Sequence, residues 1–364
     1  MIPVFTGAMR PIRAAAKTGV FFLKVLPMLP SRPLDWVTKA PVVETVVFPT
    51  RLGQVEGNLY RPSGVGPHPG VVVCLGVVPF DFDHPQIPRF AAALARSGFA
   101  ALLYRSQAMG DLRLDPDDVE SIALAYQWLL KQAYVDPTRS GMIGLCVGGS
   151  FALMAAASPL IRDSIAFVGA LAPYASMMTL ARDVCTSTRA RGKVRESWQV
   201  DPLTRKVYVR TLTALLEQRE AELLSSAFAD QSGQIDSRNL SEAARAVYPL
   251  LTPLDVKEAE TALHQLPTAM QERLATLSPL AYLKDIHASL IILGHDRDDQ
   301  VIPVSESKRL RSALSGRVGV HYTEFALFQH MDPTKRKLPP LRLVRELGKF
   351  YLFVYPLFRR AVAS

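Results

Sequence analysis

The stretch Gly141-Met142-Ile143-Gly144-Leu145-Cys146-Val147-Gly148-Gly149-Ser150 decides how the rest of the chain is interpreted. It is a short apolar run that ends in a cysteine flanked by glycines two residues before and two residues after. This G-x-C-x-G pattern is the cysteine form of the nucleophile elbow, a strained strand-to-helix turn that pushes the nucleophilic side chain outward. At the start of such a helix, the dipole and the free N–H groups favour a thiolate over a thiol. The pattern alone also fits a buried structural cysteine, so the surrounding residues have to decide.

Those surroundings favour the catalytic interpretation. Residues 135–140 contain a proline turn, and residues 151–157 predict an apolar helix of small side chains that packs under a sheet. The run over residues 135–149, V-D-P-x-R-x-G-x-I-G-x-C-x-G-G, resembles the dienelactone-hydrolase-like branch of the α/β-hydrolase superfamily, whose elbow carries Cys in place of Ser. The same stretch is also similar to polyhydroxyalkanoate synthases, which are acyltransferases with a G-x-C-x-G-G elbow.

Composition excludes several other classes of protein. The chain has 364 residues, 49% of them hydrophobic and 21% charged, which is ordinary for a soluble globular protein. Its apolar stretches are interrupted before they reach the roughly 20 residues of a membrane span. The three cysteines have no metal-site or disulfide-framework spacing, so we expect no metal, no cofactor and a reducing cytoplasmic location. The net charge of +9 is dispersed, so we expect no nucleic-acid partner.

The order of the expected elements indicates an α/β-hydrolase fold with a mostly parallel, doubly wound sheet. Residues 42–48 and 54–60 predict a β-hairpin. Continuous apolar runs predict parallel strands buried on both faces, at residues 70–76, 99–104, 142–145, 165–171, 289–294 and 318–325. Amphipathic helices alternate with them, at residues 89–97, 117–131, 304–314 and 341–352.

Residues 175–278 interrupt this alternation. They contain no convincing strand and predict helices at residues 208–223, 241–250, 254–266 and 270–277. We therefore expect an all-helical lid inserted between the sixth and seventh core strands, which leaves residues 41–174 and 279–364 as the core. A lid can shape a substrate pocket and exclude water. The alternative is an oligomerisation surface with no part in the chemistry.

Residues 1–40 predict a basic amphipathic extension. On a helical wheel, Arg10, Arg13, Lys17 and Lys24 fall on one side, and Ile12, Ala15, Gly19, Phe22, Leu23 and Leu26 fall on the other. One interpretation is peripheral contact with an anionic membrane through the two termini, since residues 351–360 form an aromatic and cationic tail. The other is a pair of helices that pack within the molecule. The sequence favours neither.

The acid of a catalytic triad is expected in the loop of residues 294–303, G-H-D-R-D-D-Q-V-I-P. In the superfamily that the chain resembles, nucleophile, acid and histidine follow in this order, each in a loop after a strand. In relatives the acid lies four residues before the proline of a D-x-x-x-P turn, which selects Asp299. Asp296 and Asp298 are the alternatives, and for them we prefer the interpretation of solvated loop charges.

The base should follow the last strand, where His330 comes after an aromatic-rich strand end. His84, which follows the strand ending at Gly76, is expected near the pocket and is a candidate substrate contact. The other histidines fit ordinary surface or packed positions, and they are His68, His264, His287, His295 and His321.

An oxyanion hole needs two backbone N–H groups aimed at the developing negative charge. Val147, directly after the nucleophile, is the first candidate, and Val77 or Val78 is the second. The His-Gly or Gly-Gly signature of the relatives is absent there. Arg105, after the fourth strand, is a candidate for binding a substrate carboxylate, although a structural ion pair is the interpretation that we prefer.

Together these residues predict a hydrolase of a carboxylic ester, lactone or thioester that works through an acyl-cysteine, with Cys146, His330 and Asp299 as its triad. The expected partner is a small-molecule acyl substrate. One alternative is an acyltransferase resembling polyhydroxyalkanoate synthase. Another is a non-catalytic binding protein associated with a membrane through its termini.

Overall fold

A single eight-stranded sheet forms the centre of the computed structural model, which describes residues 4–30, 32–51, 53–77, 84–229, 233, 235–330 and 338–362. The strand order is β1-β2-β4-β3-β5-β6-β9-β10. The strands are β1 (Val42–Thr50), β2 (Gly53–Arg61), β3 (His68–Cys74), β4 (Ala100–Tyr104), β5 (Val135–Leu145), β6 (Phe167–Leu171), β9 (Leu290–Asp296) and β10 (Val320–Phe325). Pairs β1–β2 and β2–β4 are antiparallel and all others are parallel. The predicted hairpin and doubly wound sheet are confirmed.

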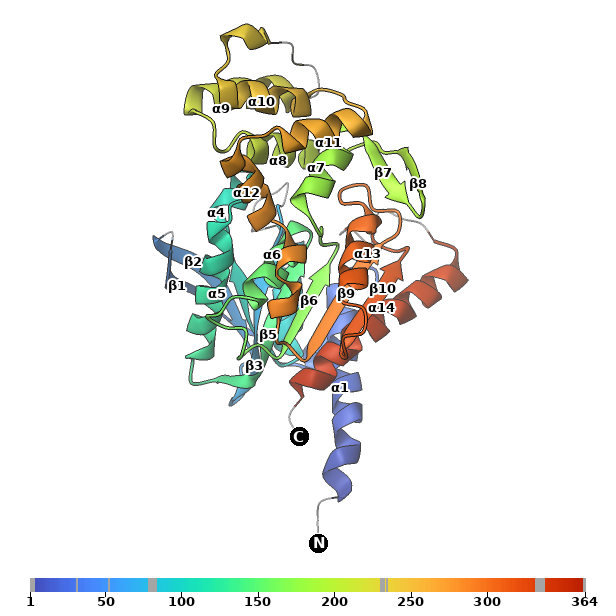
Figure 1. Cartoon of the computed structure of the whole chain (residues 1–364). Helices are drawn as coiled ribbons and strands as arrows, with labels where there is room; N and C mark the ends of the chain where they lie inside the picture. The colour runs from blue at the N-terminus through green and yellow to red at the C-terminus, as the bar shows by residue number, and fades with distance from the viewer. Residues whose placement is uncertain are drawn as a thin grey trace.

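Helices cover both faces of the sheet (Figure 1). Side chains alternate between the faces along each strand: Val71 and Val73 pack with one apolar cluster, and Val72 and Cys74 pack with the other. The first cluster joins the sheet to α1 (Val4–Val25), α3 (Gln86–Arg96) and α14 (Pro340–Ala361). The second joins it to α5 (Asp117–Leu130), α6 (Val147–Ala156) and α13 (Val304–Ala313). The strands are therefore buried on both sides, as their continuous apolar runs predict.

The two terminal helices pack on each other, α1 against α14. Tyr351 Oη donates to the carbonyl oxygen of Ala15 over 3.0 Å, and the rings of Phe21 and Phe358 lie 5.5 Å apart. The predicted end of the closing helix at residue 352 is wrong, because α14 continues to Ala361. It buries Phe350, Phe353 and Phe358 and leaves Tyr351 and Tyr355 half-buried. On the basic side of α1, Lys24 Nζ pairs with Asp35 Oδ1 at 2.7 Å, whereas Arg13 is exposed.

No helix in the described part of the chain is long and apolar enough to cross a membrane. The short helices α2 (Leu34–Val37) and α4 (Gln107–Gly110) follow α1 and β4, respectively. Contact of the termini with a membrane surface stays a prediction.

Residues 175–278, called the insertion below, lie beyond one end of the sheet (Figure 1). The insertion holds the helices α7 (Met177–Cys185), α8 (Pro202–Leu212), α9 (Gln218–Phe228), η1 (Ser237–Asn239), α10 (Glu242–Leu251), α11 (Val256–His264) and α12 (Thr268–Thr276), and the chain returns to β9 through η2 (Pro279–Ala281) and η3 (Leu283–Asp285). An unbroken helix over residues 208–223 is wrong, because α8 ends at Leu212 and α9 begins at Gln218.

The expectation of an all-helical insertion is also wrong. Strands β7 (Thr188–Arg191) and β8 (Val194–Ser197) form an antiparallel hairpin. Its turn contains Gly192 with a φ of 66°, a conformation that glycine adopts without strain. The strands are short and polar, so they lack the apolar alternation by which a strand is recognised. What holds them is a cross-strand pair, in which Arg189 Nε lies 2.9 Å from Glu196 Oε1.

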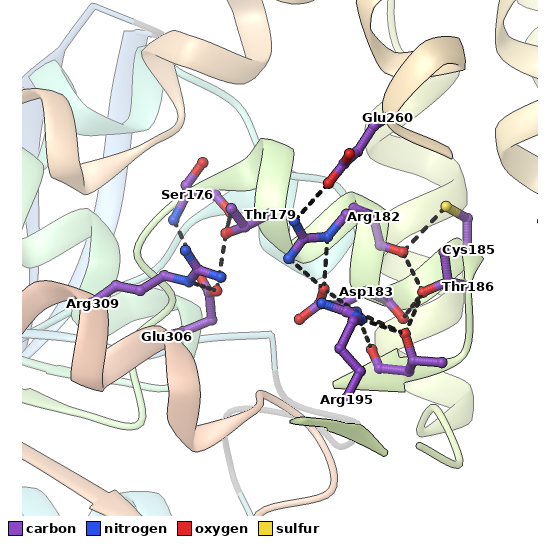
Figure 2. A network of polar contacts seen from close by, with 11 residues as sticks. Ser176, Thr179, Arg182, Asp183, Cys185, Thr186, Arg195, Glu260, Glu306 and Arg309 are labelled. Carbon is purple, nitrogen blue, oxygen red and sulfur yellow. Dashed lines mark hydrogen bonds and ion pairs between the residues drawn. The ribbon is translucent and has the colours of Figure 1, made fainter. Parts of the chain in front are cut away.

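The root of the insertion is fixed to the core by a buried carboxylate. Glu306, on α13, is fully buried and accepts hydrogen bonds from the backbone N–H groups of Ala175 (2.9 Å) and Ser176 (3.1 Å). The hydroxyl of Thr179 donates to it over 2.9 Å, and the guanidinium of Arg309 lies 3.2 Å away (Figure 2). Burial raises the pKa of Glu306 in spite of these donors.

Replacing this carboxylate should loosen the insertion from the core. We expect Glu306→Ala to lower the free energy of unfolding by roughly 3 kcal/mol, because it leaves two buried N–H groups without an acceptor. Glu306→Gln keeps one acceptor oxygen and should therefore lower the free energy of unfolding by less. The measurement is urea denaturation followed by circular dichroism. Glu56, exposed on β2, supplies the control Glu56→Ala, and an equal loss for both alanine variants would contradict the anchoring role.

Candidate active site

The turn between β5 and α6 has the backbone of a nucleophile elbow. Cys146 precedes α6 with a φ of 56° and a ψ of −136°, a conformation that side chains other than glycine rarely adopt. The flanking glycines allow it: a Cβ on Gly144 would lie 2.2 Å from the carbonyl oxygen of Gly148, and a Cβ on Gly148 would lie 2.2 Å from that of Cys74. The motif therefore folds as its glycine spacing predicts.

Cys146 opens into a cavity of about 1130 Å³. The core contributes apolar side chains to its wall, among them Leu75, Ile87, Phe90, Leu171, Phe328 and Phe350. The insertion contributes Met177, Leu180, Val184, Leu203, Val207 and Tyr208, and the end of α1 contributes Val25, Leu26 and Pro27. Three separate parts of the chain thus enclose the sulfur, and the wall around it is largely apolar.

The structure brings His330 and Asp299 together with Cys146. His330 Nδ1 lies 2.8 Å from Asp299 Oδ2, and the imidazole is within hydrogen-bonding reach of the Cys146 sulfur. Burial alone would lower the pKa of His330, but the charges of Asp299 and Cys146 outweigh it and raise that pKa well above its usual value. Burial likewise works against the Asp299 carboxylate, yet the two neighbouring imidazoles, His330 first, hold its pKa below the usual range. The arrangement favours an imidazolium beside the sulfur.

The loop that carries His330 is held by Asp296, which is almost fully buried. Its Oδ2 accepts hydrogen bonds from the backbone N–H groups of Leu327 and Phe328, both at 2.7 Å. Our interpretation of Asp296 as a solvated loop charge is therefore wrong, because the carboxylate joins the acid loop to the histidine loop. Asp298 lines the cavity.

His295 is a second histidine beside the acid. It is fully buried, and its Nε2 lies 2.9 Å from the carbonyl oxygen of Ile302 and 3.4 Å from Asp299 Oδ2. Its Nδ1 lies 2.6 Å from Ser307 Oγ. Sequence reasoning treated it as an ordinary surface or packed histidine. It lies four residues before Asp299 and is not among the described residues of the cavity wall, so it acts as a brace for that carboxylate.

One candidate donor of the oxyanion hole is in place. As the first residue of α6, Val147 has a backbone N–H without an intrahelical acceptor. Val77 lines the same cavity, whereas Val78 lies outside the described residues. Gly76 packs so tightly here that a Cβ on it would lie 2.8 Å from the Cβ of Cys146. The strand end before Val77 therefore directly adjoins Cys146.

The two candidate substrate contacts, His84 and Arg105, differ in their position relative to the cavity. His84 lines the cavity. Arg105, half-buried just after β4, is not among the described residues of the cavity wall, so binding of a substrate carboxylate there has no support. Among the residues that the structure describes, no group of three or more His, Cys, Asp or Glu side chains is arranged to hold a metal ion.

The other two cysteines, unlike Cys146, are not among the described residues that line the cavity. Cys74 and Cys185 are buried and free. Burial raises the pKa of the Cys185 thiol to about 11, and it raises that of Cys74 further. Alkylation of the folded protein should therefore report on Cys146, since only a thiolate reacts readily.

This selectivity allows a test of the packing at Gly76. We expect Gly76→Ala to slow alkylation of Cys146 by iodoacetamide about tenfold or more, because the added methyl group displaces the sulfur from its imidazole partner. Gly64→Ala is the matched control, since a Cβ on Gly64 meets nothing within 4 Å. The rate is measured by mass spectrometry of the modified peptide. Equal rates for both variants would contradict the close approach.

Known proteins resemble this chain in part. A model of the dienelactone hydrolase family matches residues 55–188. Over 128 residues the chain is 31% identical to a Bradyrhizobium sp protein named "Probable 2-oxo-3-(5-oxofuran-2-ylidene)propanoate lactonase", with 31% of this chain and 50% of that protein covered. Over 147 residues it is 30% identical to acyl-coenzyme A thioesterase 3 of Mus musculus, with 37% and 32% covered. The chain thus spans half or less of the length of these relatives.

Among solved structures, the α/β hydrolase GrgF from Penicillium sp. sh18 superposes with a TM-score of 0.52 at 15% identity, covering 89% of this chain and all of that one. At this identity the likeness concerns the fold alone. The resemblance to the dienelactone hydrolase family is confirmed over residues 55–188, and the chain has the α/β-hydrolase fold.

Proposed function

We propose that the protein is a hydrolase that cleaves a carboxylic ester, lactone or thioester of an apolar acyl group through an acyl-cysteine intermediate. The observation that carries the proposal is the contact of Cys146 with His330, and of His330 with Asp299, at the wall of a large apolar cavity. The similarity to a lactonase and a thioesterase supports the same reaction class.

In the proposed acylation, the Cys146 sulfur attacks the carbonyl carbon of the substrate. The N–H of Val147 donates to the oxygen as it gains negative charge. When the tetrahedral intermediate collapses, the bond to the leaving oxygen or sulfur breaks, and the imidazolium of His330 gives its proton to that leaving group. Asp299 holds the ring in the required tautomer through Nδ1.

In the proposed deacylation, neutral His330 takes a proton from a water molecule, which attacks the thioester carbon. The carbon–sulfur bond breaks, the carboxylic acid leaves, and the Cys146 thiolate is restored beside the imidazolium. The apolar wall favours this sequence, because it binds a hydrocarbon chain and keeps water away from the first step.

The size of the cavity supports a bulky or extended acyl group. A volume of about 1130 Å³ exceeds the roughly 300 to 1,000 Å³ of ordinary small-molecule pockets. The described lining has few charged groups; apart from its histidines they are Arg89, Asp201 and Asp298. A small, charged acyl group would leave most of this apolar surface in contact with water.

The central test compares the wild type with Cys146→Ala on p-nitrophenyl esters and acyl-coenzyme A thioesters of increasing chain length. We expect Cys146→Ala to lower kcat by about 10³-fold or more, because no covalent intermediate can form. Mass spectrometry of the wild type stopped during turnover should find the acyl group on Cys146. Undiminished turnover by the variant would refute the proposal, and acyl transfer to an added alcohol that outpaces hydrolysis would identify an acyltransferase.

The pH profile should depend on Asp299. The raised pKa of His330 keeps the imidazolium available for acylation into the alkaline range. Removing the Asp299 charge lowers that pKa, so we expect the alkaline limb of kcat/KM to move to lower pH in Asp299→Asn. The maximum should fall by about 10²- to 10⁴-fold, since the ring loses its fixed tautomer. The profile is measured with a thioester substrate, and a limb that stays in place would show that another group titrates there.

A further inference from the structure

Three consecutive backbone carbonyl groups of the acid loop, residues 296–302, accept hydrogen bonds from side chains of the insertion. The pairs are Arg189 Nη1 to the carbonyl oxygen of Asp299 (2.9 Å), Trp198 Nε1 to that of Gln300 (3.0 Å) and Thr204 Oγ1 to that of Val301 (3.0 Å). The donors precede their acceptors by 110, 102 and 97 residues. No local turn can therefore account for these contacts.

The same loop is held from its other side by Asp299 itself. Oδ1 of Asp299 accepts hydrogen bonds from the backbone N–H groups of Val301 (2.7 Å) and Ile302 (3.0 Å). The N–H groups of the loop thus face its own carboxylate, and its carbonyl groups face the insertion. Since Oδ2 is the atom that meets His330, both sets of bonds fix the position of the triad contact.

The three donors are themselves held in place. Trp198 is 1% exposed, and its backbone N–H donates to the carbonyl oxygen of Ser187 over 2.7 Å. Arg189 is held by its cross-strand ion pair with Glu196. Thr204 lies in the first turn of α8, where its N–H contacts Asp201 Oδ1. Fixed donors can impose a geometry on the loop that mobile side chains could not.

The hairpin that carries Arg189 is tied to α7, at the root of the insertion, by ion pairs (Figure 2). Arg195 Nη2, on β8, lies 2.6 Å from Oδ1 of Asp183, a fully buried carboxylate on α7. Arg182 contacts the same oxygen at 3.0 Å. The start of α7 is in turn bound by Glu306 of the core helix α13. The insertion therefore has a rigid path from the core to the acid loop.

We propose that Arg189, Trp198 and Thr204 are positioning residues for Asp299, so that the insertion sets the orientation of the acid and, through it, of His330. This inference rests on the proposed function of the triad. All three donate to the acid loop; Arg189 and Trp198 are not among the described residues of the cavity wall, whereas Thr204 also lines the cavity. The part of the insertion near its hairpin then serves catalysis by staying fixed, in contrast to a lid that opens and closes as a whole.

The test uses Thr204→Val, which keeps the side-chain shape and removes the donor, together with Trp198→Phe and the double variant. The first measurement is an NMR titration of the His330 imidazole in the resting protein, assigned by its absence in His330→Gln. We expect the measured pKa to fall from the wild-type value toward that of Asp299→Asn, most in the double variant. Besides Asp299, the groups around the ring are Cys146 and, beyond the carboxylate, His295.

The second measurement is turnover of the best ester or thioester. We expect kcat of Trp198→Phe to fall roughly 3- to 30-fold with KM nearly unchanged, since a displaced acid misorients the base, and Trp198 is not among the described residues of the cavity wall. Thr213→Val is the matched control, because this buried hydroxyl, directly after α8, donates to the carbonyl oxygen of Val209 and not to the acid loop. It should change neither the titration nor kcat.

The two proposals fail in different ways. If the wild type turns over no ester or thioester, or if Cys146→Ala remains active, the proposed function fails. The titration needs no substrate, so it still tests whether the insertion positions Asp299. If Thr204→Val leaves the His330 titration as in the wild type, the positioning role of Arg189, Trp198 and Thr204 is overturned, whatever the variant does to stability. Should Trp198→Phe fail to fold, Thr204→Val carries this test alone.

Discussion

The strained backbone at Cys146 is the constraint on which the rest of the site depends. Holding a residue other than glycine at a φ of 56° and a ψ of −136° lowers the stability of the folded state by on the order of 1 to 3 kcal/mol. The surrounding structure can hold it only because the strand end and the helix start approach within the distance that Gly144 and Gly148 allow. The geometry that exposes the sulfur to the cavity is therefore stabilised by the packing of β5, α6 and the end of β3.

Buried carboxylates organise the loops around this strained turn. Asp296, Asp299 and Glu306 are each almost or fully inaccessible to water. Asp296 and Glu306 accept hydrogen bonds from backbone N–H groups of segments remote in sequence, and Asp299 accepts them from two N–H groups of its own loop. A buried carboxylate without such donors would cost several kcal/mol. The acids therefore specify which loops lie together, and Asp299 is the one whose remaining oxygen is left to meet an imidazole.

The core of the fold could be predicted from sequence because its signals are local. Continuous apolar runs such as β3 and β9, the hairpin of β1 and β2 and the glycine spacing at Cys146 each carry their own physical cause. The order of segments then led to Asp299 and His330, which the structure brings together with Cys146, although their part in catalysis stays a prediction. The hairpin β7–β8 was missed because an ion pair, not apolar alternation, holds it. Asp296 was misjudged because its partners lie some 31 residues further along the chain.

The contacts between insertion and acid loop show why such relations escape sequence reasoning. A hydrogen bond from Trp198 to the Gln300 carbonyl uses a backbone acceptor that every residue possesses, so nothing in the identity of Gln300 signals it. The donor signals little more, because an indole N–H pairs with whatever acceptor the fold presents. Only the triad residues need particular side chains, and those are the ones that a motif reveals. Two kinds of interaction therefore determine the geometry of this site. The side chains can be recognised in the sequence, whereas the backbone contacts become visible only in the structure.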